Sequence, residues 1–129
     1  MALDFRNATA NVALDAITAL FPAGAILELR TGASPGAENA ATGTVCASIT
    51  LPATPWNAAA SGAVTKNGTW QDASADASGT AAHYRLRNAA DTHRIDGTVG
   101  LGSGDLSLDN NVIAITQVVT ISTFQFTLA

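Results

Sequence analysis

The sequence contains little cysteine, little charge and few aromatic residues, and each shortage narrows what the chain can be. Its 129 residues include one cysteine, Cys46, so no disulfide can form within the chain, as expected for a protein made in a reducing compartment. Charged residues make up 12% of the sequence, about half of the roughly 25% that is typical of globular proteins. Because hydrophobic residues make up 47%, we expect a folded chain rather than a disordered one.

Basic residues are few, and most of them are scattered. The net charge is −4 with six lysines and arginines, of which Arg85, Arg87 and Arg94 approach a patch. Pairing with aspartates, or solvation of a strand face, is the favoured interpretation of these three arginines. Since nucleic-acid binding needs clustered cations, we expect no nucleic-acid partner. The sequence also has no apolar run approaching the roughly 18 residues of a membrane span, and no secretory leader pattern, so we expect no membrane partner.

Aromatic residues make up only 5% of the chain, and much of the apolar content is alanine. Alanine fills little volume, so the predicted core depends on scattered larger aliphatic and aromatic side chains. We therefore expect neighbouring subunits to support the fold, as in a homo-oligomer. The low charge agrees with a surface that a permanent partner covers.

Helical periodicity is clear in one place, and it predicts an α-helix over 7–21. Asn7 or Thr9 is expected to cap its start, and Pro22 and Gly24 to end it. The predicted apolar stripe comprises Val12, Ala16, Ile17, Leu20 and Phe21. We expect this stripe to pack on the protein's own domain, with docking onto a neighbour as the alternative.

Beyond Gly24 the hydrophobic period changes to two, which predicts strands. The expected strands cover 25–31, 44–51, 80–88, 94–101, two short stretches near 105–109 and 112–115, and a final run over 117–128. Loop 32–43 and the glycine cluster Gly100/Gly102/Gly104 interrupt them as exposed turns. The alternation of the final run changes parity, which predicts a β-bulge or a sheet-to-sheet crossing near Ser122-Thr123.

Turn residues predict how some of these strands connect. Residues 89–93 join two alternating runs and predict an antiparallel hairpin. Lys66–Trp70 contains Asn67-Gly68, which predicts a second hairpin turn. The whole pattern predicts a single-domain, mostly β fold: an antiparallel β-sandwich or jelly-roll-like arrangement of seven to eight strands over 25–129, with an N-terminal arm and one α-helix over 1–24 packed on it.

The residue types needed for catalysis do not form a recognisable motif. Neither His83 nor His93 has metal-ligand spacing to a second histidine or to a cysteine, and both are expected at the surface or at an interface. Asp72 and Asp76 lie four residues apart but lack the distal glutamate of a calcium loop. We therefore expect no enzymatic activity, no cofactor and no resident metal.

Segments spread over nearly the whole chain carry a resemblance to known proteins. They are Arg6-Asn7, Ala13-Leu14-Asp15-Ala16, Leu29-Arg30-Thr31-Gly32, Pro35-Gly36, Ser48-Ile49-Thr50-Leu51-Pro52, Ala77-Ser78-Gly79-Thr80-Ala81-Ala82-His83-Tyr84-Arg85, Asp96-Gly97-Thr98-Val99-Gly100, Gly104-Asp105-Leu106 and Val119-Thr120-Ile121-Ser122. In these the chain resembles small proteins encoded among the virion structural genes of tailed bacteriophages. The resemblance implies a virion component made in the bacterial cytoplasm, and it transfers no catalytic residue.

Three functions follow as expectations. The first is a capsid decoration or cement protein that binds the major capsid protein on the outside of the head. The second is a structural protein of the tail, neck or fibre, which composition does not separate from the first. The third, from another class, is a small carbohydrate-binding module in which Trp56 or Trp70 stacks on a sugar ring; the favoured alternative is that these tryptophans are covered within the domain.

The residues expected to meet partners come from the arm over 1–6, the loops over 32–43 and 72–79, and the two tryptophans. They are Leu3, Phe5, Arg6, Pro35, Trp56, Trp70, Asp72 and Asp76.

Overall fold

The computed structural model describes residues 3–101 and 105–128. Helix α1 and the strands, in chain order, are α1 Asn7–Thr18, β1 Ile26–Arg30, β2 Val45–Thr50, β3 Ala63–Thr65, β4 Gln71–Asp72, β5 Gly79–Thr80, β6 His83–Arg87, β7 Arg94–Gly100, β8 Leu106–Ser107, β9 Val112–Ile113, β10 Val119–Thr120 and β11 Thr123–Thr127. The prediction of a mostly β protein with one N-terminal helix is confirmed. The first two residues of the predicted arm, and Gly102 and Gly104 of the predicted turn, lie outside the described residues.

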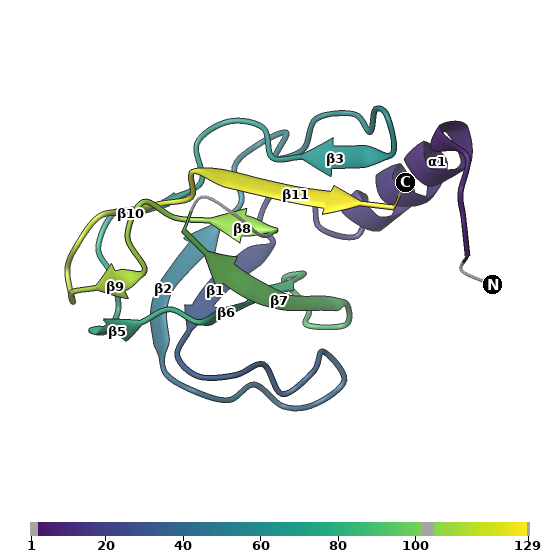
Figure 1. Ribbon diagram of the computed structural model, residues 1–129. Coiled ribbons are helices and arrows are strands. Elements are labelled where there is room, and N and C mark those ends of the chain that lie inside the picture. Colours follow the sequence, from purple (N-terminus) through teal and green to yellow (C-terminus); the bar gives the residue numbers. More distant parts are fainter. Residues whose placement is uncertain (1–2, 102–104, 129) are drawn as a thin grey trace.

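The strands form one large sheet and two small ones (Figure 1). The seven-stranded sheet has the order β2-β1-β6-β7-β8-β11-β3, and the small sheets are β10-β4 and β5-β9. The pairing of β7 with β8 is parallel, so the prediction of an antiparallel arrangement is wrong at that position. Within the described residues there are eleven strands rather than seven to eight, because several are only two residues long. The end strands β2 and β3 do not pair with each other in this part of the chain, so the sheet is open.

The centre of the large sheet follows the predicted alternation. Leu27 and Leu29 of β1 are fully buried, and β6 and β7 form the hairpin predicted around 89–93. On β7, Ile95 and Val99 pack against the core. Leu101, the last residue of the predicted strand 94–101, lies just beyond β7 and is 58% exposed. Tyr84 lies opposite Gly97, where a Cβ would come within 2.5 Å of the tyrosine ring. Glycine at this position therefore makes room for the aromatic ring.

Helix α1 ends at Thr18 rather than at residue 21, and its buried residues are Ala10, Leu14 and Thr18. The predicted stripe is right for Phe21, which is buried, and for Ile17, which packs against the core. It is wrong for Val12, Ala16 and Leu20, which are exposed, because apolar residues occupy both sides of the helix. The cap prediction is also wrong: the N-cap is Arg6, which makes no side-chain capping hydrogen bond.

After β2, the chain makes its hairpin turn at a different position from the one that the sequence predicts. The predicted hairpin at Lys66–Trp70 does not form, because β3 pairs with β11 and β4 pairs with β10. Instead, Ala60 and Ala63 bridge across Ser61-Gly62, whose φ angles of 52° and 76° are both positive. That backbone is typical of a two-residue hairpin turn, which favours glycine.

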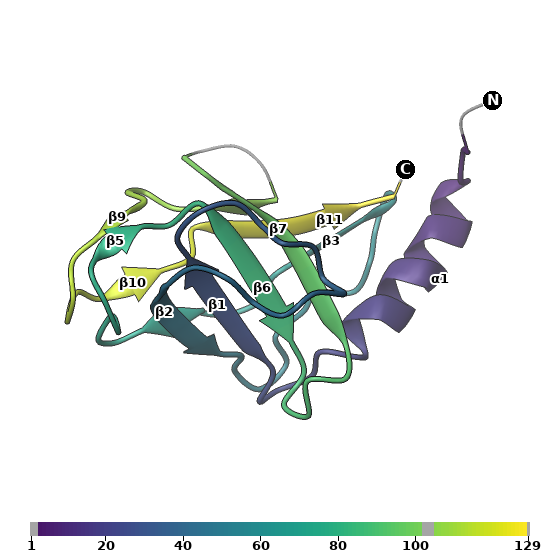
Figure 2. The same cartoon turned by 90° about the horizontal axis from the view of Figure 1, so that it is seen from below.

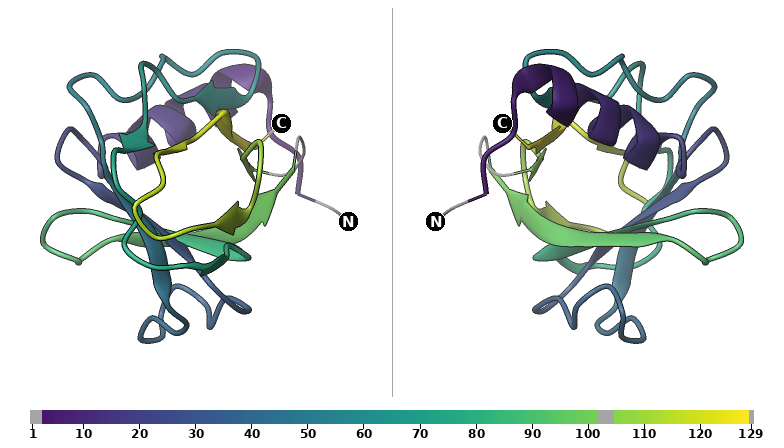
Figure 3. Two further views of the ribbon diagram at one scale, coloured as in Figure 1. Left: turned by 90° about the vertical axis from the view of Figure 1, so that its left-hand side faces the viewer. Right: turned by 90° about the vertical axis from the view of Figure 1, so that its right-hand side faces the viewer.

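The chain crosses between sheets near its C-terminal end, as the change of parity predicted. β10 belongs to the small sheet with β4, and β11 joins the large sheet between β8 and β3. Ile121 and Ser122 connect them, with Ile121 buried and Ser122 exposed. The crossing brings Phe124 into the core, where its ring lies 5.0 Å from that of Tyr84. Figures 2 and 3 show the large sheet curving around this core, with α1 at one end of the molecule.

Candidate functional site

The residues expected to meet partners fall into exposed and buried groups. Leu3 is 82% exposed. Arg6 and Asp76 are also exposed, and Phe5 and Pro35 are half-buried. These residues are dispersed, and the described contacts do not gather them into one site.

The two tryptophans belong to the interior. Trp70 is fully buried, so its predicted role as a surface contact or sugar platform is wrong. Trp56 is half-buried, its indole N–H donates to the backbone oxygen of Phe21 at 2.9 Å, and its ring lies 4.9 Å from that of Trp70. With Phe124 and Phe126 they form an aromatic cluster whose edge-on and tilted contacts stabilise the core. This arrangement agrees with the alternative in which tryptophan covers an edge of the domain.

Asp72 has a local role at the edge of the large sheet. Its carboxylate accepts hydrogen bonds from the backbone N–H groups of Ser48 on β2 and of Ser74, both at 3.0 Å. The N–H of Asp76 donates to the backbone oxygen of Cys46, also on β2, at 2.8 Å. Segment 72–77 therefore satisfies backbone groups on the outer edge of β2, which would otherwise be free to pair with another strand.

The opposite edge, at β3, is covered as well. The N–H of Asn57 donates to the oxygen of Thr65, and Ala60 and Ala63 exchange backbone hydrogen bonds. Helix α1 contacts β3, and Asn11 on the helix accepts from the N–H of Gly62 at 2.9 Å. The end strands of the large sheet therefore offer few free backbone groups to the strand of a partner.

The outward side of α1 is an exposed side-chain surface. Ala8, Val12, Ala16 and Ala19 recur at helical spacing and are exposed, with Val12 72% exposed. We call these four residues the outer face of α1. The one charged residue within the helix, Asp15, turns its carboxylate toward the N–H of Ala59 at 2.9 Å. Asn7, Thr9 and Asp15 are exposed next to these residues, so the outer face of α1 is a small apolar patch bordered by polar side chains.

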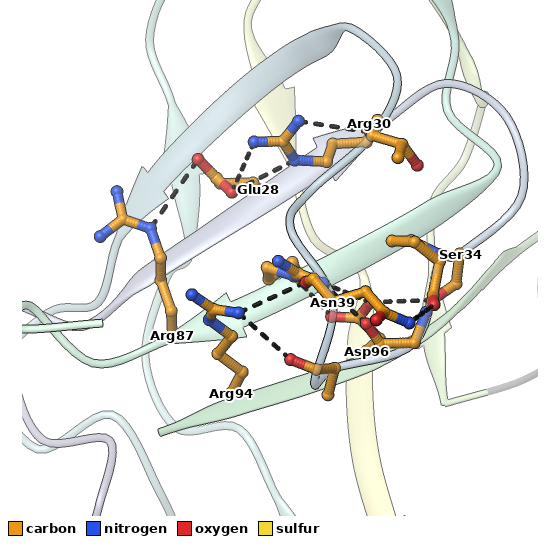
Figure 4. Close-up of polar contacts among 12 residues, drawn as sticks. Glu28, Arg30, Ser34, Asn39, Arg87, Arg94 and Asp96 are labelled. Atoms are coloured by element: carbon orange, nitrogen blue, oxygen red, sulfur yellow. Dashed lines mark hydrogen bonds and ion pairs between the residues drawn. The ribbon is translucent and has the colours of Figure 1, made fainter. Parts of the chain in front are cut away.

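A polar cluster lies on β1, β6 and β7, under loop 32–43 (Figure 4). Its centre is a buried ion pair in which Nε and Nη2 of Arg85 donate to the two carboxylate oxygens of Asp96 at 2.8 and 3.0 Å. The loop contributes the hydroxyl of Ser34, which donates to Asp96 at 2.8 Å, and the backbone oxygen of Gly36, which accepts from Arg85. The pair thus holds the loop against β6 and β7.

These contacts change the acidity of the carboxylates. Burial by itself raises the pKa of Asp96, but hydrogen bonds from Arg85 and Ser34 and the charge of Arg85 outweigh burial and hold that pKa below its ordinary value. The pKa of Asp91 is lowered chiefly by its hydrogen bonds from Arg94. Both carboxylates are therefore negatively charged at neutral pH.

Four of the six cationic residues gather in this cluster. Arg30, Arg85, Arg87 and Arg94 line one pocket of about 430 Å³ together with Glu28, Asp91, Ala40 and Ala41. Sequence reasoning identifies this cluster in part, because Arg85, Arg87 and Arg94 approach a patch along the chain. Arg30 and Glu28 were missed because they join only through the pairing of β1 with β6.

The two histidines lie in different surroundings. His93 is exposed, as predicted, but His83 is buried and its predicted surface position is wrong. Nδ1 of His83 lies 2.7 Å from the backbone oxygen of Gly32, and Nε2 is buried with no partner among the described residues. No cluster of three or more histidine, cysteine, aspartate or glutamate residues suited to a metal occurs in residues 3–101 and 105–128. Over the same ranges, no helix is long and apolar enough to span a membrane.

No protein-family model, no curated protein and no solved structure matches this chain.

Proposed function

We propose that the protein is a structural component of a tailed-bacteriophage virion, specifically a capsid decoration or cement protein on the outer surface of the head. The resemblance of the sequence to proteins encoded among virion structural genes supports a place in the virion. The outer face of α1 is the observation that supports permanent contact with another protein, and the major capsid protein is the proposed partner. A homo-oligomer of the protein on the head, repeated at equivalent positions, would agree with the low charge of the chain.

The outer face of α1 is suited to such a contact for a physical reason. Its apolar side chains gain nothing from exposure to water, and their burial against a partner is favourable by about 25 cal/mol per Å² of apolar surface. The edges of the large sheet at β2 and β3 are partly covered, which favours attachment through side-chain surfaces over strand addition to this sheet. The helix lies at one end of the molecule, where a flat partner can reach it (Figure 2).

We also infer that the fold is a variant of a β-sandwich or jelly roll. The curved large sheet brings β11 across the core from β6, as the contact between Phe124 and Tyr84 illustrates. An experimental structure of the assembled protein would test this classification, which would fail if β11 lay beside β6 rather than across from it.

Counting copies on virions tests the proposed function. Quantitative mass spectrometry of purified particles should find hundreds of copies per virion, and cryo-microscopy should place them on the head. A few copies confined to the tail, neck or fibres would contradict a decoration protein and support the alternative structural role. Absence from the particles would contradict both.

A pair of matched variants tests the binding surface. Val12→Asp introduces a charge into the outer face of α1 and should abolish binding to heads lacking the protein. Val112→Asp is the control, because Val112 is 59% exposed on β9, away from α1. Both substitutions are at exposed positions and should leave stability nearly unchanged. Equal binding by the two variants would exclude the outer face of α1 as the contact.

A further inference from the structure

We propose that the pocket under loop 32–43 is a binding site for a carboxylate group, supplied by a small organic acid or by an acidic residue or chain terminus of a protein. This site is separate from the outer face of α1 and does not depend on the proposed function. Its walls are the four arginines, Glu28, Asp91 and two alanines described above. We call it the arginine pocket.

Two of the arginines are already fully engaged. Arg30 donates to Glu28 through Nε and Nη2, and to the backbone oxygens of Thr42 and Gly43 through Nη1. Arg94 donates to Asp91 through Nε and Nη2, and to backbone oxygens of loop 32–43 through Nη1. These two residues shape the pocket and fasten the loop, and they leave no nitrogen free of a partner.

The other two arginines retain unused donors. Among the described residues, Arg87 makes a single contact, an ion pair of 3.9 Å between its Nε and Glu28. Figure 4 shows the Glu28 carboxylate between the guanidinium groups of Arg87 and Arg30, with Arg30 the closer partner at 3.0 Å. Nη1 of Arg85 also makes no hydrogen bond within the described chain. The Arg85 side chain is only 3% exposed, whereas that of Arg87 is 25% exposed, so Arg87 is the main donor that a ligand in the pocket can reach.

The strand register brings like charges together at the same place. Arg87 on β6 lies directly opposite Arg94 on β7, and like charges at opposed positions destabilise a sheet. Asp91 compensates Arg94, whereas the long contact to Glu28 compensates Arg87 only weakly. An anion beside Arg87 would relieve this imbalance.

The charge balance and geometry favour a carboxylate. Arg30, Arg85 and Arg94 each have a close carboxylate partner, in Glu28, Asp96 and Asp91 respectively, and Glu38 also acts on Arg94, so Arg87 is the arginine of this group without a close counter-charge. A carboxylate supplies one negative charge and matches a guanidinium group through paired hydrogen bonds. A phosphate dianion would bring a second negative charge next to Glu28. Ala40 and Ala41 leave space beside the arginines for the rest of the ligand.

Binding of defined probes tests the arginine pocket. Sodium acetate, sodium succinate and a capped Gly-Glu-Gly peptide would be titrated into ¹⁵N-labelled protein at constant ionic strength, with inorganic phosphate as a fourth probe. We expect saturable shifts of resonances from β6, β7 and loop 32–43 with the carboxylates. Arg87→Gln should weaken binding about tenfold or more, the loss expected for one charge-assisted contact.

Arg6→Gln is the matched control, because Arg6 is exposed at the start of α1, away from the pocket. Thermal unfolding of both variants would confirm that they remain folded. Tighter binding of the peptide than of the free acids would support a protein carboxylate as the ligand, and the reverse would support a small organic acid. Absence of saturable carboxylate binding, equal weakening by both variants, or tighter binding of phosphate would overturn the proposal.

Discussion

Replacing Asp96 with alanine should destabilise the protein strongly, because it leaves a buried guanidinium group without its counter-charge. The side chains of Arg85 and Asp96 are only 3% and 5% exposed, and they share two short hydrogen bonds. Removing one member of a buried ion pair costs about 3–5 kcal/mol. We expect a value near the lower end, about 3 kcal/mol, since Arg85 would keep its hydrogen bond to the backbone oxygen of Gly36.

Equilibrium unfolding in urea measures this loss directly. A loss of about 3 kcal/mol is a large part of the roughly 5–15 kcal/mol that stabilises a typical domain, and it should lower the midpoint at nearly constant slope. Asp91→Ala is the control, because the Asp91–Arg94 pair is exposed and its removal should change stability far less. The double variant Arg85→Met/Asp96→Ala should lose clearly less than the two single variants together, because no buried charge remains.

A small loss in Asp96→Ala would refute this reasoning. If the variant lost less than about 1 kcal/mol, as an exposed pair does, then the pair would be solvated in solution and loop 32–43 would not cover it. Additive losses in the double variant would show that Arg85 and Asp96 do not interact energetically.

Three further predictions use the same unfolding measurement. Gly97→Ala should cost about 1–3 kcal/mol by forcing a Cβ against the Tyr84 ring, whereas the neighbouring exposed Thr98→Ala should cost much less; equal effects would mean that the ring moves away freely. Phe124→Ala should cost about 3–5 kcal/mol, because its ring contacts Trp56, Trp70 and Tyr84, and a loss no larger than that of the exposed Val118→Ala would contradict the aromatic core. Because the pKa of Asp96 is lowered in the folded protein, its ionised carboxylate stabilises the fold fully above the ordinary aspartate pKa of about 3.9. This contribution disappears as the pH falls through the lower folded pKa. The stability difference between wild type and Asp96→Asn should therefore shrink on acidification, and a constant difference would argue against the lowered pKa.

The central strands were predictable because their side chains alternate between one buried and one exposed environment. Leu27 and Leu29, for example, alternate with Glu28 and Arg30, and β1 forms where expected. The crossing near Ser122 was predictable for the same reason, since a change of parity must be accommodated by the backbone. Alternation failed at β6, where His83 and Arg85 occupy the expected polar face but are buried beneath loop 32–43.

The remaining features depend on contacts between distant parts of the chain. The buried face of α1 was ambiguous, because Val12 and Leu14 offer apolar residues on opposite sides and only packing against the sheet selects one. The arginine pocket requires the register that sets Arg87 opposite Arg94 and Glu28 opposite Arg85. Short strands such as β4 and β10 are too brief for any periodicity to reveal.

The position of Cys46 gives the protein a natural reporter of its own local opening. This thiol is fully buried on β2, burial raises its pKa, and a Cβ on Gly79 would lie 3.1 Å from its sulfur. A thiol reagent can reach it only after the structure around Cys46 has opened locally. Since the sequence has no other cysteine, the labelling rate of the unmodified protein measures how often this part of β2 opens without global unfolding.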